Sequence, residues 1–325
     1  TLPATMTSNM ARPRVYRIRR PKMRRRGEEA LHRPIRPSLH SGSSPRGRRA
    51  WSGTLLASTG AVPELPDVET QRRYVARHAT SRVVERTDLD RADEMLDGVG
   101  PGEVERALDH QPLVEADRHG KVLFVRLGSG DHLVLRFGMT GFLKKYSDES
   151  DAPDHARLTM IFDDGSRLAF DCQRRFGLIG LVDTPNDWIE RHDLGPDLLG
   201  ITESLFVERL AGRRGAIKSA LMDQSVFAGL GNIYSDEVMF QARLHPRDRV
   251  SDLSRRRARD LHECTQQVLE EAIRCRAEPR RMPASWLLPH RDDDEPRCPR
   301  CRFRLERVAV NRRSAWLCPR CQLPN

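Results

Sequence analysis

Two stretches of the chain carry residue types that could do chemistry, and the more specific one lies near the C-terminus. Four cysteines form two pairs there, Cys298-x2-Cys301 and Cys318-x2-Cys321. Paired thiolates on two turns supply the tetrahedral sulfur shell that structural Zn²⁺ prefers, and four protein ligands leave no open position for catalysis. The spacing therefore predicts one structural zinc ion per chain, with the 16 residues between the pairs folded as a β-hairpin.

The second stretch runs from Val62 through Pro63 and Glu64 to Asp67. A proline that begins a chain has a secondary amine, which can attack an electrophilic carbon, whereas a proline inside a chain is a tertiary amide and cannot. Glu64, the next residue, can move protons at the same carbon. This chemistry requires Pro63 to be the first residue of the active protein, so we expect the 325-residue chain to lack it.

The segment before Pro63 differs in composition from the rest. Residues 1–61 hold 14 Lys and Arg but 2 Asp and Glu, and they show no sustained hydrophobic period. This composition is typical of disorder. We interpret residues 1–62 as a disordered basic leader that is absent from the mature protein; a nucleic-acid-binding arm or a transit peptide is the alternative. The remaining chain holds 42 basic and 44 acidic residues, so DNA binding must rest on placed residues rather than bulk charge.

The secondary structure expected around these residues changes along the chain, from one helix to strands and then to further helices. Pro66 to Ala79 reads as a helix with Pro66 in its first turn and Asp67 at its positive end. Short apolar runs follow, separated by Gly, Asp and Ser, and predict an antiparallel β-sandwich or barrel. The predicted strands are Val122–Leu127, His132–Phe137, Leu158–Phe162, Leu168–Asp171 and Leu178–Val182.

A Gly/Pro break at 194–200 then separates this region from helices predicted at 202–211, 217–224, 232–240 and 252–275. Residues 276–297 read as irregular. The fold class is α+β: a β-sandwich domain with a leading helix (63–193), a helical domain (201–275), and an irregular loop with the zinc hairpin (276–325).

The joint between two of these helices has a pattern of its own, Gly229-Leu230-Gly231-Asn232. The two glycines permit close approach of another backbone. Asn232 is a favourable N-cap, and free N–H groups at a helix start bind phosphate. Taken alone, the pattern is also compatible with a plain joint between two helices.

Three segments together resemble one family: Pro63–Thr70, Lys218–Phe240 and the cysteine module, in this order. They are similar to the formamidopyrimidine-DNA glycosylase / endonuclease VIII family, and the Pro-Glu-Leu-Pro opening favours the formamidopyrimidine branch. The resemblance implies that the helical domain is a helix-two-turn-helix. It also implies a bifunctional glycosylase and AP lyase that removes oxidised bases, above all 8-oxoguanine and formamidopyrimidines, from double-stranded DNA. The reaction would proceed through a Schiff base at Pro63 and β,δ-elimination.

The resemblance assigns roles to nine residues of this chain. Those at the reacting sugar and its flank would be Pro63 as nucleophile, Glu64 as acid and the strand lysine Lys121. Those that grip DNA or fill the space left by an extruded base would be Met139, Arg174, Phe176, Asn232 and Arg313, with Lys218 near the damaged base. An enzyme that acts on a base must take it out of the stack, so a flexible Met, an Arg and a Phe wedge suit the second group.

Alternatives remain at this stage. Met139 and Phe176 could be core residues, and Lys121, Lys218 and Arg313 could be solvated charges. Residues 276–297 do not look like the loop with which the formamidopyrimidine branch covers 8-oxoguanine. An endonuclease VIII-like enzyme for oxidised pyrimidines and a catalytically silent zinc-finger DNA-binding protein are therefore rival interpretations.

The cellular setting follows from what the sequence lacks. There is no apolar run of 18 or more residues and no convincing secretory signal. Three of the seven cysteines are isolated and four have metal-site spacing, which favours a reducing compartment. We expect a monomeric cytoplasmic protein of the bacterial nucleoid with no membrane contact.

Overall fold

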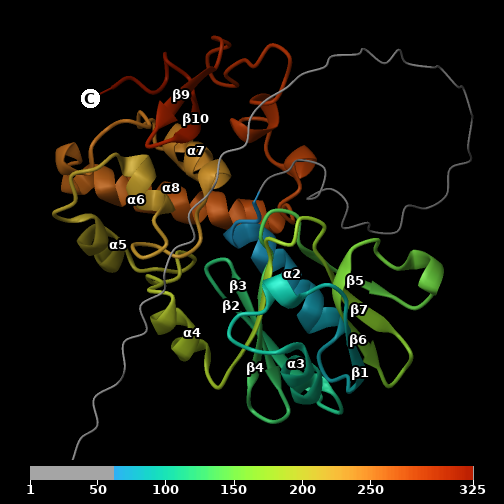
Figure 1. Cartoon of the computed structure of the whole chain (residues 1–325). Helices are drawn as coiled ribbons and strands as arrows, with labels where there is room; N and C mark the ends of the chain where they lie inside the picture. Colours follow the sequence, from blue (N-terminus) through green and yellow to red (C-terminus); the bar gives the residue numbers. More distant parts are fainter. Residues whose placement is uncertain (1–61, 325) are drawn as a thin grey trace, which may run out of the picture. The chain divides into compact units, whose positions relative to one another are not determined.

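The computed structural model describes residues 62–324, and the predicted leader lies outside the described residues apart from Val62. Figure 1 shows a β-sandwich, a group of helices and a small hairpin. No helix within 62–324 is long and apolar enough to cross a membrane. The α+β fold class expected from the sequence is confirmed.

The leading helix, α2 (Leu65–His78), connects two hydrophobic cores. Leu65 is fully buried in the core of the helical half, whereas Val68 and Val75 are buried in the core of the sandwich. The helix begins where it does because the Asp67 carboxylate accepts the Glu64 N–H at 2.8 Å, which closes the first turn. It starts and ends one residue earlier than predicted. A helix shared by both cores fixes the stretch around Glu64 against each of them.

The sandwich has two four-stranded antiparallel sheets, ordered β1-β6-β7-β5 and β2-β3-β4-β8. The first contains β1 (Val84–Leu89), β5 (Phe142–Tyr146), β6 (Ala156–Phe162) and β7 (Arg167–Asp171). The second contains β2 (Leu113–His119), β3 (Val122–Leu127), β4 (His132–Arg136) and β8 (Leu178–Val182). The five predicted strands correspond to β3, β4, β6, β7 and β8.

The remaining strands and two helices were not predicted as elements. They are β1, β2 and β5, together with α3 (Pro101–Leu108) and α4 (Pro185–Arg191). Each of these strands has exposed or half-buried charged residues between its buried positions, as in Glu85 and Arg86 of β1 or Lys144 and Lys145 of β5. A half-solvated strand lacks the apolar run that marks a fully buried one, so it is weak as a sequence signal.

The helical half contains α5 (Glu203–Leu210), α6 (Ile217–Met222), α7 (Asn232–Gln241) and α8 (Arg255–Arg274). All four helices were predicted; the starts of α6 and α7 coincide with the prediction, and the other ends are shifted by one to three residues. The start of α8 is set by Ser254, whose hydroxyl accepts the Arg257 N–H at 3.3 Å. The shared core includes Phe206, Phe227 and Leu261, all fully buried.

Between α8 and the zinc hairpin the chain contains only two 3₁₀ turns, Pro279–Arg281 and Leu288–His290. The hairpin consists of β9 (Glu306–Val310) and β10 (Arg313–Leu317). Its two turn residues, Asn311 and Arg312, have φ of 44° and 65°. Two consecutive positive φ values are the requirement of a type I′ turn, which suits the twist of a two-stranded ribbon. The irregular segment and the hairpin agree with the predictions.

Candidate functional site

The centre of the site is Glu64, which is 2% exposed. Its carboxylate accepts three backbone N–H groups at the start of α7: Gly231 at 2.6 Å, Ile233 at 2.7 Å and Tyr234 at 3.2 Å. Next to it, the Leu65 N–H donates to the Gly229 carbonyl at 3.0 Å. An acid that precedes the leading helix therefore caps a helix about 170 residues further along the chain.

This contact corrects one prediction. Asn232 is the first residue of α7 rather than its N-cap; Gly231 occupies the cap position, and no side chain of the helix itself caps α7. The N–H groups expected to be free for phosphate are in part taken by Glu64. What Asn232 offers a ligand is its side-chain amide, whose Oδ1 is buried without a hydrogen-bond partner.

The two glycines of this joint are explained by Glu64 and Leu65. A Cβ on Gly231 would lie 2.5 Å from the Glu64 Oε1, and one on Gly229 would lie 2.5 Å from the Leu65 Cδ1. Gly229 also has φ of +139°, a conformation that other residues rarely adopt. The close backbone approach predicted from the sequence is therefore an approach to the Pro63–Glu64 stretch.

Pro63 is buried, and its nitrogen is joined to Val62, which is 46% exposed. Lys121 is half-buried at the start of the β2–β3 hairpin's second strand. Burial lowers the pKa of Lys121, while the carboxylates of Glu64 and Asp67 oppose that shift. These interactions place Glu64 and Lys121, two of the three predicted catalytic residues, within electrostatic reach of one another.

The charge environment around Lys121 extends to the zinc hairpin. Arg313 and Arg136 also act to lower the Lys121 pKa, which places both cations near it. Burial raises the pKa of Asp67 to about 7, against its bond from the Glu64 N–H. A lysine with a lowered pKa beside an acid with a raised one is an arrangement common at sites of proton transfer.

A second set of contacts fastens the sandwich to the chain that leads into the helices. The Asp197 carboxylate accepts the Arg118 guanidinium at 2.5 Å and the Gly120 N–H at 2.6 Å. Gly120 has φ of +55°, and a Cβ there would lie 2.7 Å from the Ala228 Cβ. The turn that carries Lys121 is thus pressed against the loop that precedes α7.

The predicted phosphate ligands Asn232 and Arg313 line the same groove, which has a volume of about 650 Å³. Arg307 and Arg312 line it as well. Arg312 and Arg313 are exposed, and within residues 62–324 neither makes an ion pair with an acid. Unpaired guanidinium groups beside a side-chain amide form a surface suited to the DNA backbone.

The residues predicted to replace an extruded base lie on two adjoining loops. Gly138 (φ +64°) approaches so closely that a Cβ would lie 2.4 Å from the backbone of Phe176. The Arg174 N–H donates to the Thr140 hydroxyl at 3.3 Å. Phe176 is 55% exposed, with the Arg174 guanidinium carbon 5.3 Å from its ring centroid, and Met139 between Gly138 and Thr140 is half-buried. Phe176 is therefore not a core residue.

Lys218 occupies a different environment from the other predicted DNA ligands. Its side chain is 1% exposed and forms an ion pair with the fully buried Asp236. The ammonium also donates to the Asn232 carbonyl and the Ser235 hydroxyl, each at 3.2 Å. Burial lowers the pKa of Lys218, and Asp236 opposes that shift. The structure does not present this lysine on the surface of the groove.

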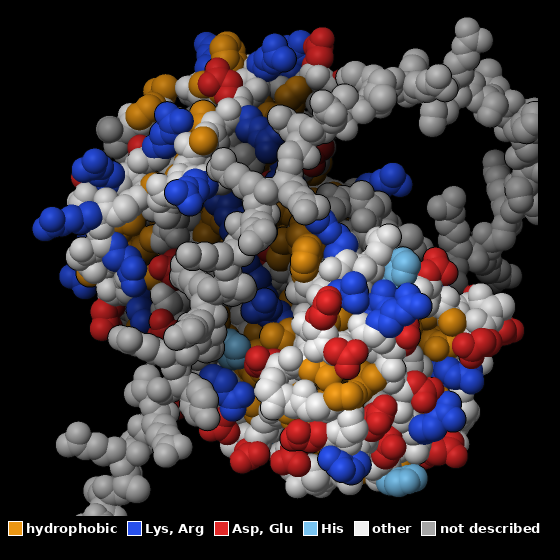
Figure 2. Space-filling view, in the orientation of Figure 1, with side chains coloured by type: hydrophobic (Ala, Val, Ile, Leu, Met, Phe, Trp, Pro, Cys, Tyr) orange, Lys and Arg blue, Asp and Glu red, His pale blue; other side chains and the backbone are white. Residues whose placement is uncertain are grey.

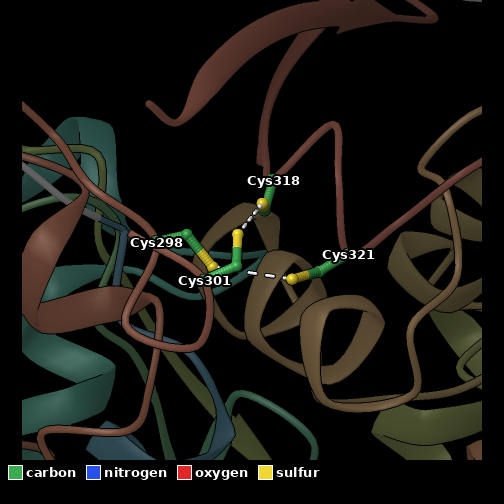
Figure 3. Close-up of side chains that lie close together, drawn as sticks. All are labelled: Cys298, Cys301, Cys318 and Cys321. Carbon is green, nitrogen blue, oxygen red and sulfur yellow. Dashed lines mark hydrogen bonds between the residues drawn. The ribbon is translucent and has the colours of Figure 1, made fainter. Parts of the chain in front are cut away.

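The four predicted metal ligands converge from two turns, as Figure 3 shows. Their sulfur atoms all lie within 4.8 Å of one another, with Cys298 and Cys321 3.8 Å apart and Cys301 and Cys318 3.4 Å apart. Tetrahedral Zn–S bonds of about 2.3 Å require sulfur separations of about 3.8 Å. The donor set fits one structural Zn²⁺, which would join the two ends of the hairpin.

Charge is unevenly divided between the two halves. Residues 62–200 hold 18 Lys and Arg and 27 Asp and Glu, whereas residues 201–325 hold 24 and 17. On the face seen in Figure 2, Lys and Arg side chains gather over the helical half, and acidic side chains are more frequent over the sandwich. The balanced total charge of the body thus conceals a basic half, which suits nucleic acid.

A two-sheet sandwich joined to a helical domain and a four-cysteine hairpin is a DNA-binding architecture, and comparison with known proteins identifies it. Residues 62–179 match the model of the formamidopyrimidine-DNA glycosylase N-terminal domain, and residues 194–282 match its H2TH domain. Residues 296–323 match a zinc finger found in FPG and IleRS.

Individual relatives cover most of the chain. The formamidopyrimidine-DNA glycosylase of Halorhodospira halophila is 34% identical over 272 residues, 80% of this chain and 100% of the relative. That of Arabidopsis thaliana is 30% identical over 71% of this chain, which spans 63% of the plant protein. A crystal structure of Lactococcus lactis Fpg with DNA containing an abasic site has a TM-score of 0.71 and 26% identity. The alignment covers 80% of this chain and 100% of that one. The chain belongs to the formamidopyrimidine-DNA glycosylase family.

From the sequence, no functional role was predicted for three acids of this site. Asp67 holds the Glu64 N–H, Asp197 holds the turn before Lys121, and Asp236 holds Lys218. A signal existed for Asp236, because it lies four residues after Asn232 and therefore on the same helix face. Asp67 also had a local signal, because it lies three residues after Glu64, the spacing of a capping box. Asp197 acts through a tertiary contact that no local spacing predicts.

Proposed function

We propose that this DNA glycosylase and AP lyase uses Pro63 as its nucleophile and acts on oxidised purines in double-stranded DNA. The observation that carries the proposal is the position of Glu64. Its carboxylate lies next to Pro63, at the start of the helix that bears Asn232, and within electrostatic reach of Lys121. A protein that only binds DNA has no need of a buried acid beside a proline.

The reaction follows from this arrangement. The Pro63 amine attacks the sugar C1′; the N–C1′ bond forms, and the base leaves with the bonding electron pair and takes up a proton. The nitrogen then loses its proton and the C1′–O4′ bond breaks, with O4′ taking up a proton, which leaves an iminium at C1′. The iminium withdraws electrons, so C2′ loses a proton and the C3′–O bond breaks with release of the 3′ phosphate. A second elimination breaks the C5′–O bond.

Glu64 is suited to moving these protons. A carboxylate has about four acceptor positions. Three of them are used by the N–H groups of Gly231, Ile233 and Tyr234, with two on Oε2 and one on Oε1. One position on Oε1 is left for the reacting sugar, and the three fixed bonds orient it. Asn232, Arg313 and Lys121 would hold the flanking phosphates, and Met139, Arg174 and Phe176 would fill the space of the extruded base.

The proposal requires Pro63 to be the N-terminal residue of the active form, because the lone pair of an acylated nitrogen is delocalised into the carbonyl group and does not attack. Borohydride trapping on abasic DNA tests it with three proteins: the full chain, a form that begins at Pro63, and that form with Pro63→Gly. We expect a covalent adduct at Pro63 only in the second. Trapping through Lys121, or equal trapping of the full chain, would contradict the assignment.

The lesion is tested separately by comparing cleavage of duplexes with 8-oxoguanine, a formamidopyrimidine and thymine glycol by the Pro63-starting form. Preference for thymine glycol would favour an endonuclease VIII-like specificity. We propose further that 63–193 carries the chemistry, 201–275 grips DNA, and 276–325 completes the grip. We also propose a monomer in the bacterial cytoplasm near the nucleoid, which gel filtration and cell fractionation would test.

A further inference from the structure

The buried pair Lys218–Asp236 connects three parts of the site that are distant in sequence. Lys218 lies on α6, Asp236 lies on α7, and both side chains are at most 1% exposed. A buried ion pair is expensive to form, because both charges lose their hydration. Its presence beneath the groove therefore calls for a reason other than stability.

The contacts of the pair supply that reason. One Asp236 oxygen binds the Lys218 ammonium, and the other accepts the Trp316 N–H of the zinc hairpin at 3.1 Å. Lys218 in turn donates to the Asn232 carbonyl at 3.2 Å. A continuous chain of bonds thus runs from β10, which begins with Arg313, to the first residue of α7.

A further contact links the turn of the zinc hairpin to α6. The Asn311 side-chain amide at the hairpin turn donates to the Ser219 hydroxyl at 2.7 Å, one residue after Lys218. Asn232 has its Oδ1 buried without a partner, so its side chain is oriented by its backbone rather than by its own bonds. The main chain of Asn232, held by Lys218, is then what aims the amide into the groove.

We propose that Lys218 and Asp236 are positioning residues that hold the zinc hairpin and Asn232 at a fixed spacing, so that both contact the DNA backbone together. In this role Lys218 makes no contact with the damaged base. The proposal rests on the proposed function only in taking Asn232 and Arg313 as phosphate ligands. It differs from the role that the family resemblance implies for Lys218, which places a lysine near the base.

Equilibrium binding of the full chain separates the two roles without any catalytic step. Duplexes with a tetrahydrofuran abasic analogue and with 8-oxoguanine are compared for wild type, Lys218→Met and Asp236→Asn. Lys144→Met is the matched control, because Lys144 lies on β5 and its ammonium donates to the Asp151 carbonyl. Zinc content and far-ultraviolet circular dichroism are recorded for every variant.

Positioning predicts that Lys218→Met and Asp236→Asn each raise the Kd about tenfold, equally for both duplexes, with one zinc per chain retained. The Asp236→Asn variant separates positioning from a simple charge effect more clearly than Lys218→Met does. Removing a buried negative charge near the DNA strengthens binding if only charge matters, whereas loss of the fixed spacing between the hairpin and Asn232 weakens it. The Lys218→Met/Asp236→Asn double variant should be no weaker than either single variant, because all three break one chain of contacts.

Two results would overturn the proposal: a Lys218→Met defect confined to the 8-oxoguanine duplex, which would mean base contact, or unchanged or tighter binding by Asp236→Asn. If Asp236→Asn lost zinc, its weaker binding could not be assigned to positioning. The Lys218→Met result would then decide between the two roles, because this variant leaves the Trp316 bond in place. Failure of wild type to prefer the abasic analogue over undamaged DNA would instead count against the proposed function.

Discussion

Gly231→Ala tests the site through a methyl group alone. Gly231 has a negative φ, −122°, which does not by itself exclude alanine. The new Cβ would nevertheless lie 2.5 Å from the Glu64 Oε1 and 2.6 Å from its Cδ. Either the carboxylate or the start of α7 must move by about 0.9 Å to restore ordinary contact of about 3.4 Å.

The magnitude follows from the bonds that this movement disturbs. Glu64 accepts N–H groups at 2.6, 2.7 and 3.2 Å, and a shift of that size breaks at least one of them. A hydrogen bond to a charged group contributes about 1.5–3 kcal/mol. We therefore expect the free energy of unfolding to fall by about 2 kcal/mol. Misplacement of a reacting group by about 1 Å costs about 100-fold in rate.

The assay is single-turnover nicking of an abasic duplex by the Pro63-starting form, with urea denaturation alongside. Gly215→Ala is the control, because a Cβ at Gly215 would meet nothing within 4 Å. Nicking by Gly231→Ala within threefold of wild type, at wild-type stability, would refute the role of Glu64 in this geometry. A loss of stability without a loss of rate would leave Glu64 as a cap and remove it from catalysis.

Three further predictions concern other parts of the chain. Burial raises the pKa of Glu237 to about 7 from its ordinary 4.5, so folding favours the protonated form of this side chain. The stability that Glu237 contributes therefore falls as pH rises from about 4.5 to 7. Glu237→Gln should flatten the pH dependence of the unfolding free energy over that range by about 3 kcal/mol; an unchanged slope in urea titrations would contradict this. Removing zinc with a chelator should loosen the hairpin and weaken DNA binding at least tenfold, reversibly on adding Zn²⁺, as followed by fluorescence anisotropy. Phe176→Ala should slow base removal at least tenfold but leave nicking of preformed abasic sites within threefold, since no base remains to be extruded; equal losses in both assays would count against the wedge role.

Local signals in the sequence predicted much of this fold. The regular cysteine spacing, the apolar runs of β3 and β8 beside glycines, and the helices α5 to α8 each follow from short-range chemistry. The strands β1, β2 and β5 were missed because charged residues alternate along their exposed faces. The start of α8 was misplaced because the decisive cap, Ser254, lies inside a run of polar residues.

The site was harder to predict in detail, because its precision comes from long-range contacts. The sequence indicated that Pro63, Glu64 and the Gly-x-Gly-Asn joint matter, but not that Glu64 caps α7. Asn232 was expected to cap its own helix, and the true cap is 168 positions away in sequence. The resemblance placed Lys218 near the damaged base, whereas the structure shows its ammonium buried against Asp236.

The capping of α7 by Glu64 has a consequence for how the two halves move. Every donor to this carboxylate belongs to the helical half, while the acid itself belongs to the helix shared with the sandwich. Any rotation that separates them breaks three charge-assisted bonds at once and leaves a buried anion without partners. Glu64, the proton carrier of the proposed reaction, thus also holds the two halves together. We therefore expect the molecule to meet DNA already closed, so that the bend needed to expose a lesion comes from the duplex.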